Sequence, residues 1–66
     1  MKAKYTLRED AVIHRIVMRL EKIDRIDING RFDGRSIILN SDDAKDRKVM
    51  IMLNELDLIE TIELVA

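Results

Sequence analysis

Residues 2–7 alternate between apolar and polar side chains, which is the pattern of a short half-buried strand. One face would carry Ala3, Tyr5 and Leu7, and the other Lys2, Lys4 and Thr6. The sequence therefore predicts a first strand that is covered on one side only.

A helical repeat follows this strand. Thr6 and Glu9 are spaced as in a capping box, which predicts a helix that begins at Leu7 or Arg8 and runs to about residue 22 or 23. Its apolar residues fall within about 140° of arc on a helical wheel; they are Val12, Ile13, Ile16, Val17 and Leu20.

The stretch IDINGRFDGRSIIL, residues 26–39, holds both glycines and two candidate turns. A turn at Asn29-Gly30 would shorten the strand before it, whereas Asp33-Gly34 suits a two-residue hairpin loop. We therefore predict a hairpin of strands 25–32 and 35–40. Gly30 would then lie inside a strand and mark a bulge or a close approach to the backbone.

Three consecutive apolar residues, Ile37 to Leu39, indicate a strand that is covered on both faces, as in the centre of a sheet. In the stretch NSDDAKD, Ser41, Asp42 or Asp43 would cap a second helix. The buried stripe of that helix would be Val49, Met52, Leu53 and Leu56. The run VMIML could also form a strand, because short apolar runs are ambiguous. We favour a helix, followed by a last strand from Ile59 to Val65.

The predicted order is strand, helix, strand, strand, helix, strand. With right-handed crossovers this order gives an α+β fold of the ferredoxin-like βαββαβ plait type, with an antiparallel sheet and two helices on one face. The chain of 66 residues would form a single domain spanning residues 1–66.

The stretches EDAVIHRIV, DINGRFDGRSIIL and LNELDLIETIELV together resemble the small regulatory domains of the ACT type and the related NIL type. The resemblance covers nearly the whole chain and is one of hydrophobic spacing. It implies a ferredoxin-like regulatory domain. ACT domains bind an amino acid at the first strand-to-helix loop, often beside a Gly, and here that loop is LRED, without a Gly.

The stretch VIHR also resembles the IHAR of the histidine-containing phosphocarrier protein, which shares the same predicted order of elements. This resemblance implies that His14 would be phosphorylated. The capping box, however, places His14 about two turns into the helix, where the free N–H groups that receive a phosphate are absent.

Composition narrows the function classes. The chain has no Cys, a net charge of -1 and 38% charged residues of both signs, which excludes thiol-based metal or redox sites and a polybasic nucleic-acid surface. No apolar run approaches the length of a membrane span, and residues 1–10 lack the apolar stretch of a signal peptide. We therefore expect a cytoplasmic protein without a cofactor, a metal or a membrane partner.

Two groups of polar residues are candidate ligand sites. Arg8 begins a basic strip along the first helix that would bind an anion or remain a solvated flank, and Asp10 lies one turn before His14. Asp27, Asn29 and Arg31 form a polar row on the outward face of the predicted second strand, and Gly30 lies between them on the other parity, where a ligand would approach the backbone. A carboxylate cluster, Asp42, Asp43 and Asp46, does not have the spacing of a Ca²⁺ loop and fits helix capping.

We expect a non-catalytic regulatory or assembly module that binds a small ligand or a protein partner. The alternatives are a pure interaction adaptor or inhibitor without a ligand, and a phosphocarrier that uses His14. A chain this short buries only about 60% of its unfolded surface, which favours a homodimer. Its interface would use the outward face of the sheet, at Ile38, Ile59 and Val65, or would extend the sheet through an edge strand.

Overall fold

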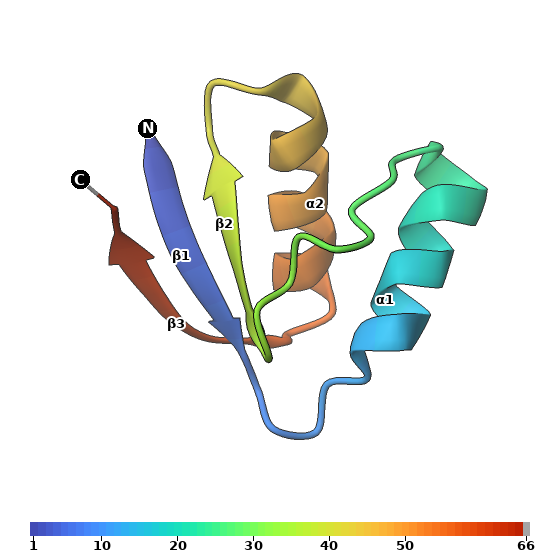
Figure 1. Cartoon of the computed structure of the whole chain (residues 1–66), viewed down its shortest axis with the longest axis horizontal. Helices are drawn as coiled ribbons and strands as arrows, with labels where there is room; N and C mark the ends of the chain where they lie inside the picture. Colours follow the sequence, from blue (N-terminus) through green and yellow to red (C-terminus); the bar gives the residue numbers. More distant parts are fainter. Residues whose placement is uncertain (66) are drawn as a thin grey trace.

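The computed structural model describes residues 1–65 and contains three strands and two helices (Figure 1). In chain order they are β1 (Lys2–Leu7), α1 (Ile13–Arg19), which continues as one π-helical turn, η1 (Leu20–Asp24), β2 (Ser36–Asn40), α2 (Ala44–Glu55) and β3 (Ile59–Leu64).

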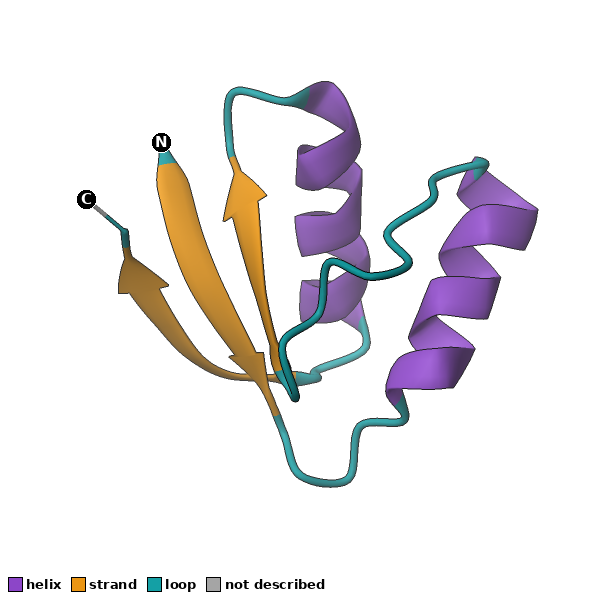
Figure 2. Ribbon diagram, in the orientation of Figure 1, coloured by secondary structure: helices purple, strands orange, loops and turns teal. Residues whose placement is uncertain are grey.

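The three strands form an antiparallel sheet in the order β2-β1-β3. Both helices lie to the same side of this sheet, and β3 is the strand farthest from α1 (Figure 2). The predicted α+β class, the antiparallel sheet and the two helices are therefore confirmed. The sheet has three strands instead of four, and β1 is its centre; the prediction of a central strand at 35–40 is wrong, because β2 lies at an edge.

The predicted strand 25–32 does not form, but its alternation correctly predicts which side chains are buried. Ile26 and Ile28 are buried in the core, and the polar residues between and around them are exposed. A turn closes after them, where the Arg31 N–H donates to the Ile28 carbonyl at 3.1 Å and Gly30 adopts a φ of +83° that favours glycine. This segment thus buries its two isoleucines in the core without pairing with a neighbouring strand.

The predicted turn at Asp33-Gly34 also forms. Asp33 and Ser36 exchange two backbone hydrogen bonds, of 2.7 and 3.0 Å, around Gly34, whose φ is +60°. These two bonds form an isolated bridge next to β2. Both Asn29-Gly30 and Asp33-Gly34 are therefore turns, and Gly30 is not a strand bulge.

The first helix begins at Ile13, about five residues later than predicted, and the capping box is wrong. Thr6 remains in β1, where its hydroxyl pairs with that of Ser36 at 3.0 Å. The N–H groups of Leu7 and Arg8 donate to Arg35 and Leu58 carbonyls, both at 2.8 Å. These two bonds hold Leu7 and Arg8 beside the neighbouring segments of the sheet, so the helix begins only after the chain has left them.

The second helix and the last strand are confirmed. VMIML lies within α2, and Asp43 caps that helix by accepting from the N–H groups of Lys45 and Asp46 at 2.8 and 3.2 Å. Val49 and its neighbours on the predicted stripe are buried, except the exposed Leu56, which follows the last helical residue.

One hydrophobic core joins the sheet, both helices and the segment after η1. Its buried members are Leu7, Ile16, Leu20, Ile26, Ile28, Ile37, Leu39, Val49, Met52 and Leu53. Ile38 points the other way with 47% of its surface exposed, as the sequence predicts. Among residues 1–65, neither helix has the length and apolarity to cross a membrane.

Candidate functional site: the two edges of the sheet

The five predicted ligand residues do not come together. Arg8 and Asp10 lie in the loop that follows β1. Asn29 and Gly30 form an exposed turn, and Arg31 is held against β2 through its guanidinium. The structure thus separates the two predicted groups.

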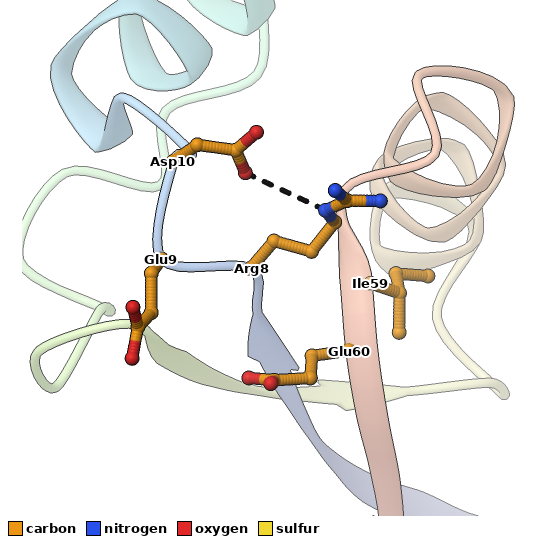
Figure 3. Close-up of a pocket in the computed structure, with 5 residues that line it drawn as sticks. All are labelled: Arg8, Glu9, Asp10, Ile59 and Glu60. Carbon is orange, nitrogen blue, oxygen red and sulfur yellow. Dashed lines mark ion pairs between the residues drawn. The ribbon is translucent and has the colours of Figure 1, made fainter.

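Arg8 and Asp10 line an open hollow of about 550 Å³ beside the start of β3 (Figure 3). The Arg8 Nε lies 3.5 Å from Asp10 Oδ1, and its Nη1 lies 3.6 Å from Asp57 Oδ2. Glu9 and Glu60 add two further carboxylates to the lining. Because carboxylates outnumber the single cation, the hollow disfavours a ligand carboxylate or phosphate.

Arg31 has a structural partner. Its Nη1 and Nη2 donate to both carboxylate oxygens of Asp46, at 2.9 and 3.1 Å, in a bidentate pair. Asp46 is only 5% exposed and also accepts the Asn40 N–H at 2.8 Å. The hydrogen bonds from Arg31 lower the pKa of Asp46 against the opposing effect of burial, and the same pair raises the pKa of Arg31. No local pattern in the sequence indicates this pair, because the two residues are 15 positions apart.

This ion pair helps to close the outer edge of β2. The Arg31 Nη2 also donates to the Ile38 carbonyl at 3.0 Å, and Asp46 takes the Asn40 N–H. Further along, Ser36 uses its N–H and carbonyl in the bridge to Asp33. Residues 1–65 therefore supply partners for nearly all outward backbone groups of β2, which blocks the addition of another strand.

The outer edge of β3 is different. The Val65 N–H bonds to the Lys2 carbonyl, and antiparallel ladders alternate between inward and outward residues. The N–H and carbonyl groups of Ile62 and Leu64 therefore point away from β1. In the part of the chain that the structure describes, no other segment lies along this edge.

Two apolar side chains of β3 are exposed beside this edge. Ile62 and Leu64 pair in register with Tyr5 and Ala3, which places them on the helix side of the sheet. The helices do not reach them, and they are 56% and 73% exposed. An open row of backbone groups and two exposed aliphatic side chains thus coincide on one strand.

The three predicted dimer residues do not share one face. The register shifts by one residue between Thr6 and Leu7, so that Ile59 pairs with Leu7 and packs against the core. Ile38 lies on the opposite face, and the alternation from Glu63 places Val65 there as well. On that face Lys4 lies between Ile38 and Glu63 in the register, so the surface is mixed and not a continuous apolar patch.

His14 is exposed in the first turn of α1, and not two turns into a helix as the capping box predicts. Asp10, which the predicted helix places one turn before His14, is paired with Arg8. Within residues 1–65, no cluster of three or more His, Cys, Asp or Glu side chains is arranged to hold a metal ion.

Comparisons with protein-family models, with curated proteins and with solved structures find no match to this chain. The function is therefore inferred from the contrast between the two edges of the sheet.

Proposed function

We propose that the protein is a non-catalytic assembly module that binds an extended protein segment as an added strand along β3. The carrying observation is that β2 has its outer edge closed by Arg31, Asp46 and Asp33, whereas β3 leaves its outer edge open. Strand addition uses main-chain hydrogen bonds for affinity and alternate side chains for specificity.

The edge offers both contributions. Each hydrogen bond to the outward groups of Ile62 and Leu64 would add about 0.5–1.5 kcal/mol. Full burial of an aliphatic side chain of this size adds about 1.5–3 kcal/mol. A partner segment with apolar residues at alternate positions would meet both side chains on the helix side of the sheet.

A small anionic ligand in the Arg8 hollow has less support, since Arg8 is already paired with two carboxylates.

The proposal is tested with octapeptides selected from a random display library against the purified protein. We expect the selected peptides to shift the amide NMR signals of Ile62 and Leu64. Ile62→Pro removes an outward N–H without removing a bond to β1, so this variant should fold and bind the peptides about tenfold more weakly.

Ile51→Lys, on the exposed face of α2, is the control and should bind as the unchanged protein does. Peptides that bind Ile62→Pro equally well, or that shift the signals of Arg8 and Asp10 instead, would contradict the proposal. A library that yields no β3-binding peptide would contradict it too.

A further inference from the structure

We infer that the segment bound at β3 is β3 of a second copy, paired antiparallel around a two-fold axis at Ile62. This inference rests on the proposed function and names its partner. The two three-stranded sheets would join into one continuous sheet with β3 and its copy at the centre.

The register follows from charge. Two registers keep both Ile62 and Leu64 within the pairing: one centred on Ile62 and one centred on Glu63. The second would place the two Glu63 side chains directly opposite each other, with Cα atoms about 4.5 Å apart, and like charges so placed destabilise a ladder. In the first, Glu63 faces Thr61 of the other copy, and the outward groups of the two Ile62 residues bond to each other.

The layers agree with this arrangement. A two-fold axis perpendicular to the joined sheet keeps the helices of both copies on one face. Ile62 and Leu64 lie on that same face in each copy, so the two Ile62 side chains would face each other at the axis, and each Leu64 would lie diagonally beside them, opposite Glu60 of the other copy. Exposed apolar surface would thereby be buried against identical surface, as a two-fold interface requires.

The closed β2 edge explains why the assembly would stop at two copies. In the joined sheet both outer strands are β2, most of whose outward groups are occupied by Arg31, Asp33, Asp43 and Asp46. A sheet that ends in two blocked edges cannot add a third copy. Packing through the open sheet face is disfavoured, because that face carries Lys2 and Lys4 in each copy.

Sedimentation equilibrium of the full chain at micromolar concentrations tests the dimer. We expect the unchanged protein to have twice its monomer mass. Ile62→Lys, which places two ammonium groups at the axis and removes the apolar contact, should weaken dimerisation roughly a hundredfold. Ile51→Lys is the matched control, since Ile51 is 57% exposed and Ile62 is 56% exposed, and it should remain a dimer.

Oxidative cross-linking tests the register, because the chain has no Cys of its own. Around an axis at Ile62, the two Ile62 Cα atoms lie about 5.5 Å apart, within disulfide range, and the two Glu63 Cα atoms roughly 8 Å apart, beyond it. Ile62→Cys should therefore form a disulfide-linked dimer under mild oxidation, and Glu63→Cys should not.

A monomeric unchanged protein, or a dimer that Ile62→Lys leaves intact, would overturn the inference. Cross-linking through Glu63→Cys in preference to Ile62→Cys would overturn the register. If the protein is a monomer but selected peptides still bind at Ile62 and Leu64, the proposed function stands and only the identity of the partner is wrong. If both experiments fail, the proposed function falls with the inference.

Discussion

Ile28→Ala is expected to lower the free energy of unfolding by about 3 kcal/mol. Ile28 is fully buried, although it lies in a segment that forms neither strand nor helix. The truncation removes apolar contacts and leaves a cavity at the place where this segment meets both helices and the sheet. For a domain of this size, such a loss is a large part of the total stability.

Urea unfolding followed by circular dichroism measures the effect. Ile23→Ala is the control, because Ile23 is exposed at the end of the first helical segment and should cost no more than about 0.5 kcal/mol. Equal losses in the two variants would show that the segment after η1 is not docked on the core.

Asp46→Ala is expected to cost about 2 kcal/mol, more than Asp43→Ala, which removes only a helix cap and should cost about 1 kcal/mol. The larger loss arises because Asp46 binds both Arg31 nitrogens and the Asn40 N–H from a buried position. Urea unfolding at neutral pH measures the loss of stability in both variants. A larger loss in Asp43→Ala than in Asp46→Ala would contradict this interpretation.

The same carboxylate gives a pH signature. The pKa of Asp46 is lower in the folded protein than its ordinary value of 3.8. Its stabilisation is therefore fully present above that value and is lost as the pH falls through the lower, folded-state pKa. The stability difference between the unchanged protein and Asp46→Asn should shrink from neutral pH to about pH 2.5. A difference that stays constant over this range would show that the charge of Asp46 does not contribute.

Local sequence patterns correctly predict the elements that are specified by residues close together in the chain. The alternation from Lys2 to Leu7 predicts β1 at its observed bounds, and Asp43 with Val49 predicts α2. The capping box at Thr6 and Glu9 fails because it is an equally local pattern that competes with a non-local one. The N–H of Leu7 bonds to a residue 28 positions away, which no local pattern shows.

The alternation of Ile26 and Ile28 shows the same limit in another form. It predicts correctly which side chains are buried, but burial does not require a ladder partner. The turn at Gly30 ends the extended segment before it can pair along β2. A sequence pattern reports the environment of side chains more directly than it reports the partners of backbone groups.

The candidate site is predictable only in part. The outward position of Ile38 follows from alternation on β2 and is confirmed. The position of Ile59 does not follow, because a register shift opposite Leu7 reverses the alternation on β3. The closure of the β2 edge by Arg31 and Asp46 depends on two segments that only the folded chain brings together.

Amide hydrogen exchange at Ile62 and Leu64 tests most directly whether the β3 edge is a pairing surface. These two N–H groups point away from β1, so in a monomer they should exchange rapidly. The amide of Glu55, an exposed residue at the end of α2, should exchange slowly by comparison. We predict that their exchange slows as the protein concentration rises through the range of dimer formation, while the exchange of the Val65 amide, which bonds to Lys2, stays unchanged. Rapid exchange of Ile62 and Leu64 at every concentration would contradict pairing along this edge.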